Sequence, residues 1–246
     1  MTSPLLRGLS RYATLDGDDV RLLEEQLETQ VRTYDAGQDF IRQGDRPMHS
    51  YLILDGWAYC YKTLPNRRRQ ILSFLLPGDV SDPNICSLHR MDHSIASLTA
   101  TTLMALPQTL VRTLMGGAHP SIGKALAAQT LAAAAIQREW TVNLGQRSAP
   151  ERIGHVLCEL FHRLRAVGLT SGNQCFLPLT QTDLAETTGL SLVHVNKRLR
   201  DLRSADLIIL RGKMLTLPDL RALETASLFT ADYLNLFDVA DANRLV

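Results

Sequence analysis

One stretch in the second half of the chain combines helix-capping residues, a glycine turn and side chains that can read a nucleic-acid base. Asn196 carries an amide that can form two hydrogen bonds with adenine, and Lys197 can reach the O6 and N7 atoms of guanine. Thr180 and Ser191 can each cap a short helix, and Gly189 can end the first helix in a left-handed conformation. The spacing predicts a helix-turn-helix whose second helix offers a basic, amide-bearing face to the major groove of duplex DNA.

Two short strand-like runs follow the second predicted helix. The apolar runs 207–210 and 214–217 flank Arg211, Gly212 and Lys213, a pattern that is typical of a hairpin and predicts a wing. The tip of this wing would bring Arg211 and Lys213 to the DNA phosphates. The side chains that we expect at the DNA are Thr180, Ser191, Leu192, Val193, His194, Asn196, Lys197, Arg200, Arg211 and Lys213.

The charge of the chain is balanced overall but not locally. Lys and Arg number 26 against 25 Asp and Glu, yet residues 147–221 hold 11 basic and 7 acidic side chains. A local basic excess is the electrostatic footprint of a nucleic-acid-binding module. The competing interpretation is an enzyme in which the two helices only pack together. The sequence has no nucleophile–base spacing, phosphate-binding glycine loop or zinc-protease signature, so we expect no catalytic residues and no enzymatic activity.

The composition indicates a globular protein, because 45% of the 246 residues are apolar and 21% are charged. The chain has no apolar run long enough for a membrane span, and its N-terminus lacks the apolar stretch of a signal peptide. Cys60, Cys86, Cys158 and Cys175 form no CxxC pair, so we expect reduced thiols. These features predict a cytoplasmic protein without a membrane partner.

Residues 119–146 are predicted to form a long dimerisation helix that begins near Pro120 and ends at a hinge around 145–150. Seven residues recur at alternating spacings of four and three, which is the pattern of a seam between two packed helices. We expect a second copy of the chain to contact this seam; the alternative is that the helix packs on its own strand domain. The seam residues are Ile122, Leu126, Gln129, Ala133, Ile136, Trp140 and Asn143.

The first part of the chain, residues 1–118, alternates short strand-like runs with turns. Asp55-Gly56 separates the runs 51–55 and 57–61 and predicts a β-hairpin. Every second residue of 57–61 is aromatic, so one face of that strand is expected to be strongly apolar. Many short strands at this spacing predict a β jelly roll.

The predicted fold class is therefore α+β, in four consecutive parts. A β jelly-roll domain covers 1–118, the long helix and hinge cover 119–146, and a winged helix-turn-helix domain covers 147–221. Within the last domain, the polar residues 170–174 are expected to form a loop. Residues 222–246 are expected to form a helical tail that packs on the body of the protein, with a role that the sequence leaves open.

The order of these motifs resembles the Crp/Fnr family of bacterial transcription regulators over nearly the whole chain. Residues 36–45 and 51–56 are similar to the first strands of the family's sensor domain, and 67–79 to the entry of its ligand cassette. The resemblance implies a sensor domain of the cyclic-nucleotide-binding type and a homodimer that reads a two-fold operator in double-stranded DNA. The half-sites of such an operator lie about 34 Å apart. The resemblance also implies RNA polymerase as a partner, with an unknown signal.

The chain departs from the family pattern where cyclic nucleotides bind. Members that bind them carry Gly-Glu-Leu and, later, an Arg followed by Ser or Ala; here the two places, 78–80 and 93–96, read Gly-Asp-Val and His-Ser-Ile-Ala. Without that arginine, an anionic cyclic phosphate lacks its usual partner. Members with an iron–sulfur cluster hold it through N-terminal cysteines, whereas the first cysteine here is Cys60. We therefore expect no cofactor.

Three alternatives for the signal stay open. The first is a cyclic nucleotide, and the second is a metal ion or haem at Cys86, His89 and His93. On a helix, His89 and His93 would share one face because they are four residues apart. The third is redox sensing by a thiol, which requires an exposed cysteine in a basic setting.

Overall fold

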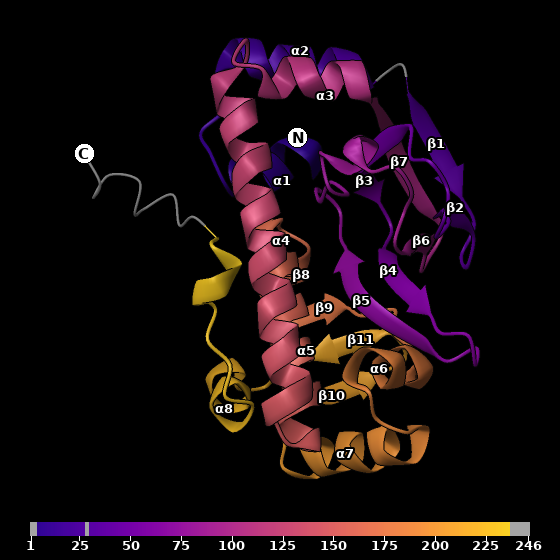
Figure 1. Cartoon of the computed structure of the whole chain (residues 1–246). Helices are drawn as coiled ribbons and strands as arrows, with labels where there is room; N and C mark the ends of the chain where they lie inside the picture. Colours follow the sequence, from indigo (N-terminus) through magenta and orange to yellow (C-terminus); the bar gives the residue numbers. More distant parts are fainter. Residues whose placement is uncertain (1–3, 28–29, 237–246) are drawn as a thin grey trace.

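The computed structural model describes residues 4–27 and 30–236 of the chain. Its first domain contains two antiparallel sheets (Figure 1). One sheet has the strand order β1 (Val31–Tyr34), β7 (Thr101–Pro107) and β3 (His49–Asp55). The order in the other sheet is β2 (Asp39–Ile41), β6 (Ser94–Ser97), β4 (Ala58–Thr63) and β5 (Arg69–Leu75). Apolar residues of both sheets, among them Ile53, Ile95 and Leu103, share one core. This arrangement confirms the predicted β jelly roll.

The Asp55-Gly56 turn does not form the predicted hairpin. Strand β3 pairs with β7, whereas β4 pairs with β5 and β6, so the two strands that flank the turn lie in different sheets. Gly56 has a φ of +78°, and a Cβ there would lie 2.2 Å from the carbonyl oxygen of Ala100. The glycine therefore carries the chain from one sheet to the other through a gap too narrow for a side chain. The hairpin prediction was wrong because an Asp-Gly turn can join two strands of one sheet or carry the chain between two sheets. The local sequence does not distinguish these two connections.

Helices close one end of the jelly roll. These are α1 (Pro4–Ser10), α2 (Gly17–Leu27), α3 (Gln108–Met115) and the short 3₁₀ helix η1 (Ile85–Ser87). Leu6, Leu9 and Leu23 from α1 and α2 pack with Leu114 of α3 and Ile122 of the following helix in a second core. The sequence analysis did not predict α1 and α2, although Val20, Leu23 and Leu27 of α2 recur at helical spacings of three and four.

The long helix α4 (Pro120–Gln146) runs past both domains (Figure 1). Six of the seven predicted seam residues are buried against the chain's own body: Ile122, Leu126, Gln129, Ile136, Trp140 and Asn143. Only Ala133 of that set is exposed. The spacing identified a buried helix face correctly, but a stripe of this kind does not reveal which partner covers it. A second copy of the chain could therefore reach only a different face of α4.

The second domain begins two residues after α4 and forms a winged helix-turn-helix. Its helix α5 (Ala149–Ala166) starts with a capping box between Ser148 and Glu151. The predicted polar loop at 170–174 is instead part of a hairpin, and its two strands join the wing in a sheet of four with the order β10-β11-β9-β8. The remaining elements are β8 (Thr170–Ser171), β9 (Gln174–Phe176), α6 (Gln181–Thr188), α7 (Leu192–Ser204), β10 (Ile209–Arg211), β11 (Met214–Thr216) and α8 (Leu220–Ala226).

The segment after α8 packs back onto α5 and α4. Phe229 and Tyr233 lie against the imidazole of His155, and η2 (Asp232–Leu234) reaches α4. The predicted tail is helical only at 222–226, which form the end of α8; residues 227–236 form turns and one short 3₁₀ helix, and residues 237–246 lie outside the described part of the chain. None of the described helices combines the length and the apolar character that crossing a bilayer requires.

A buried ion-pair network joins the two domains. Arg163 of α5 donates to Asp79 Oδ2 at 2.8 Å and to the carbonyl oxygen of Phe74 at 2.7 Å. Arg11, which follows α1, donates to the other oxygen of Asp79 at 2.7 Å. Arg163 also pairs with Glu159 at 3.2 Å, and Glu159 in turn accepts a hydrogen bond of 2.8 Å from the indole of Trp140. One carboxylate thus connects the N-terminal helices, the jelly roll and the winged domain.

The charge balance around Asp79 favours its ionised form. Burial raises the pKa of Asp79, but the guanidinium groups of Arg163 and Arg11 outweigh burial and hold that pKa below its usual value. Apolar packing surrounds the network, because Trp57, Tyr59 and Phe74 of the jelly roll share a core with α5. The apolar strand face predicted from 57–61 is therefore the face that the winged domain covers.

We expect Asp79→Ala to lower the free energy of unfolding by about 3–5 kcal/mol, because it leaves two buried arginines without their shared carboxylate. The measurement is a urea denaturation series on the full chain. Asp18→Ala is the matched control, since Asp18 pairs with Arg21 at the exposed surface of α2, where ion pairs contribute little. A midpoint for Asp79→Ala equal to that of the control would contradict this account.

Candidate functional site

The helix-turn-helix forms with the capping residues that the sequence predicted. The Thr180 hydroxyl accepts a hydrogen bond from the backbone of Asp183 at 3.1 Å, and the Asp183 carboxylate accepts one from the Thr180 backbone at 2.8 Å. Gly189 ends α6 with a φ of +67°. Ser191 caps α7 by accepting from the backbone N–H of His194 at 3.3 Å. These contacts fix the angle at which α7 leaves the turn.

The two faces of α7 have opposite character. Val195, Leu199 and Leu202 are buried in the domain core, as the spacing predicted. The outer face begins with Leu192 and Val193, and the side chain of Val193 is 76% exposed. The other outer-face residues are polar or basic: His194, Asn196, Lys197, Arg200 and Arg203.

Local contacts already hold some of these outer side chains. The Asn196 amide donates to the Leu192 carbonyl oxygen at 3.2 Å. Arg198, which the sequence analysis did not assign to the DNA, pairs with Asp201 at 3.0 Å. Lys197 is exposed and forms no ion pair with any described residue. Lys197 is thus free to contact an external acceptor.

The wing stands beside α7 at the same end of the molecule (Figure 1). In the pairing of β10 with β11, Ile209 lies opposite Thr216 and Arg211 lies opposite Met214. Gly212 turns the chain between the two strands with a φ of +60°. Arg211 and Lys213 are both exposed at this tip. The fold therefore gathers the predicted DNA-facing residues at one end, although the Thr180 hydroxyl is engaged in capping α6.

The jelly roll also holds the helix-turn-helix through the β4–β5 hairpin. Arg69 pairs with Glu186 of α6 at 2.6 Å, and the Gln70 amide donates to the Thr187 carbonyl oxygen at 3.2 Å. The Arg69 guanidinium also lies over the ring of Tyr59. Sequence analysis missed this contact, because the run Arg67 to Arg69 has the composition of an ordinary solvated hairpin tip.

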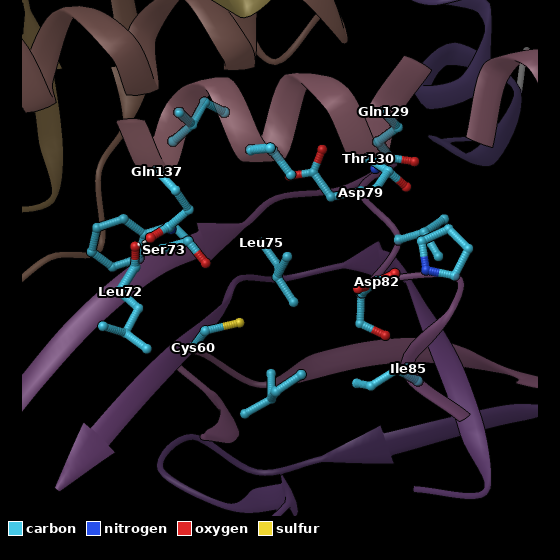
Figure 2. Close-up of a pocket in the computed structure, with 18 of the residues that line it drawn as sticks. Cys60, Leu72, Ser73, Leu75, Asp79, Asp82, Ile85, Gln129, Thr130 and Gln137 are labelled. Carbon is cyan, nitrogen blue, oxygen red and sulfur yellow. Dashed lines mark hydrogen bonds between the residues drawn. The ribbon is translucent and has the colours of Figure 1, made fainter. Parts of the chain in front are cut away.

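A cavity of about 400 Å³ lies between the jelly roll and α4 (Figure 2). Its wall is mostly apolar, and its cationic side chains are Arg163 and His93. Each of them is paired with a carboxylate, Asp79 and Asp92 respectively, and Asp82 adds another carboxylate to the wall. A cyclic nucleotide needs a free cation for its phosphate, so these residues do not fit that ligand.

The predicted metal-binding spacing has no structural basis in the described residues. The segment from 88 to 93 is not helical, so His89 and His93 do not share a helix face. His93 instead contacts Asp92, with 2.8 Å between Nδ1 and Oδ1. Within the described ranges, no three His, Cys, Asp or Glu side chains are grouped to hold a metal ion.

A β jelly roll joined by one long helix to a winged helix-turn-helix defines a transcription regulator that carries a sensor-type domain and a DNA-binding domain in one chain. Models of two domain families match the chain at the corresponding places. The Crp-like helix-turn-helix domain matches residues 151–226, and the cyclic nucleotide-binding domain matches residues 31–117.

Relatives with the same organisation match over most of their length. The transcriptional activator protein FnrL of Cereibacter sphaeroides is 32% identical over 208 residues, which cover 82% of this chain and 80% of FnrL. The nitrogen fixation regulation protein FixK of Rhizobium meliloti is 28% identical over 181 residues, 74% of this chain and 79% of FixK. The solved structure of FixK2 from Bradyrhizobium japonicum superposes with a TM-score of 0.71 at 21% identity, covering 82% of this chain and 98% of that chain. The chain belongs to the Crp/Fnr family of transcriptional regulators.

We expect Gly189→Ala to lower the free energy of unfolding by about 1–2 kcal/mol, since an alanine must adopt the left-handed conformation there. The added Cβ would meet only Leu144 at 3.4 Å, an ordinary contact, so the cost comes from the backbone. Gly17→Ala is the control, because a Cβ at Gly17 has no neighbour within 4 Å and its φ is ordinary. Equal denaturation midpoints for the two variants would show that the turn does not need glycine.

Proposed function

We propose that the chain acts as a homodimer that inserts α7 of each copy into successive major grooves of a two-fold DNA operator. The observation that carries this proposal is the exposed outer face of α7, held rigidly by its cap and by the docking of α6 on the jelly roll. The wing tip with Arg211 and Lys213 would contact phosphates beside each half-site. Two recognition helices related by a two-fold axis require half-sites about 34 Å apart.

The exposed face of α4 offers the contact between the two copies. Ala127, Leu131, Ala134, Arg138 and Val142 recur at spacings of four, three, four and four, and Leu131 is 68% exposed. Ala127 and Ala134 are small and lie on either side of Leu131, so a second helix could approach closely and bury Leu131 and Val142. This stripe replaces the seam predicted from the sequence as the dimer contact.

The exposed side chains of α7 determine which DNA bases the helix would contact. Lys197 suits the O6 and N7 atoms of guanine, and Asn196 can offer its amide to adenine once it releases Leu192. Val193 and Leu192 present methyl groups at the N-terminal end of the helix, where contact with the C5-methyl group of thymine is favourable. We therefore propose an operator that pairs guanine recognition by Lys197 with a thymine opposite Val193.

Other partners and the cellular location follow from this role. Because FnrL is named a transcriptional activator, we propose RNA polymerase as a further partner, and the cytoplasm as the place where the chain meets DNA. We assign the chain no catalytic activity, and we propose no metal, haem or cyclic-nucleotide cofactor for the described residues.

The first test separates base contacts from phosphate contacts by measuring affinity for selected duplexes across a salt series. Lys197→Ala is expected to lose about 1–3 kcal/mol at one base position and to relax specificity there. Lys213→Ala is expected to weaken all sequences alike and to reduce the salt slope by about one. Arg46→Ala, an exposed change on the jelly roll, should leave binding unchanged. Affinity that is independent of both sequence and salt would reject the proposal.

The second test addresses the dimer. Leu131→Glu places a charge in the middle of the proposed α4 contact and should convert the dimer to a monomer in native mass spectrometry. Operator affinity should fall when the dimer dissociates, because each monomer then binds one half-site only. Met48→Glu is the matched control, since Met48 is 65% exposed on the jelly roll and lies outside both α4 and the β4–β5 hairpin. A dimer that survives Leu131→Glu would exclude this stripe as the interface.

A further inference from the structure

A thiol, an imidazole and a carboxylate lie in series on the wall of the cavity between the jelly roll and α4. Cys60 of β4 pairs with Ile95 of β6, and His93 directly precedes β6, so this pairing brings Cys60 and His93 to the same wall of the cavity. His93 contacts Asp92 at 2.8 Å, and all three side chains line the cavity. A histidine oriented by a carboxylate beside a cysteine is the arrangement that activates a thiol as a nucleophile.

We propose that Cys60 is a covalent modification site whose thiol adds to an uncharged α,β-unsaturated carbonyl compound bound in this cavity. This inference goes beyond DNA binding and does not rest on it. Figure 2 shows the sulfur of Cys60 directed into the cavity from the strand side, with Gln129, Thr130 and Gln137 extending from α4 opposite it.

The protonation of His93 supports a reactive Cys60. Hydrogen bonds with Cys60 and Asp92, together with the charge of Asp92, raise the pKa of His93 to about 9, against the opposing effect of burial. Lys62 is the other charged group near this pair, and Asp82 lines the same cavity. At neutral pH a cationic imidazole therefore stands beside the sulfur, which is the setting in which cysteines react.

The other three cysteines lack this environment. Burial raises the pKa of the Cys158 thiol strongly and that of Cys175 to about 12, and it also raises the pKa of Cys86. Cys158 and Cys175 are packed in the core of the winged domain, away from any cavity wall described above. Cys86 is half-exposed and has no histidine partner among the described contacts, so it provides an internal comparison for Cys60.

The cavity selects the chemical class of the reactant. Apolar side chains such as Leu75, Ile85 and Ile136 dominate the wall, while the carboxylates of Asp82 and Asp92 disfavour an anion. Gln129 of α4 is only 6% exposed, and its Oε1 atom has no hydrogen-bond partner among the described residues. A ligand that carries a hydrogen-bond donor as well as a conjugated carbonyl would satisfy this buried oxygen.

The reaction needs no oxidant, reductant or leaving group. The sulfur electron pair of Cys60 forms a bond with the β-carbon of the alkene, and the π electrons move to the carbonyl oxygen. The His93 imidazolium gives its proton to the α-carbon of the resulting enolate, and the neutral imidazole that remains takes the proton that the sulfur releases. The net result is the addition of S–H across the carbon–carbon double bond.

The test is limited alkylation of the full chain with maleimide, an uncharged imide with an N–H donor, followed by peptide mass spectrometry. Cys60 should react before Cys86. His93→Gln should slow Cys60 at least about tenfold without changing Cys86. His89→Gln, an exposed histidine in the same segment, is the matched control and should change neither rate. Faster reaction at Cys86 in the unaltered chain, or an unchanged Cys60 rate in His93→Gln, would overturn the proposal.

One further measurement keeps the test decisive if His93→Gln disturbs folding. Relative to maleimide, its anionic relative maleimidoacetate should react more slowly with Cys60 than with Cys86. Equal slowing at the two cysteines would also reject the site.

Discussion

The carboxylate of Asp79 is the point at which the three parts of this protein meet. Arg11 reaches it from the N-terminal helices and Arg163 from the winged domain, while Asp79 itself belongs to the loop after β5. All three side chains are buried, so each charge depends on the others for its compensation. The orientation of the DNA-binding domain therefore rests on a residue of the sensor-type domain.

The same network limits what the cavity can bind. Arg163 and Asp79 both line the cavity, but their charges are used between the domains. Arg163 is thus committed to holding α5 and is not free to pair with an anion in the cavity. A molecule in this cavity would contact both α4 and the interdomain network. Occupancy of the cavity is therefore physically linked to the position of α7. Any signal molecule would have to bind with different affinities to two positions of α7 relative to the jelly roll.

Local chemistry made the DNA-binding end of the protein predictable. Thr180, Gly189 and Ser191 act through contacts within a few residues, so their types and spacing were enough to place α6 and α7. The alternation predicted for 57–61 is also present in the structure. Trp57 and Tyr59 lie on one face, and Ala58 and Cys60 lie on the other. In both cases the interaction that fixes the structure lies within the segment itself.

What the sequence by itself determined is therefore the order of the jelly roll, the long helix and the winged helix-turn-helix, and the outward face of α7. Only the tertiary structure decided which surface covers each apolar face: the predicted seam of α4 packs on the chain's own body, and the strands around Asp55-Gly56 separate into two sheets. Tertiary structure alone also brought Cys60 to His93 and Asp79 to Arg163 across long stretches of chain. Apolar patterning specifies that a face is buried, but the partner depends on the summed packing of distant segments, which no local pattern contains.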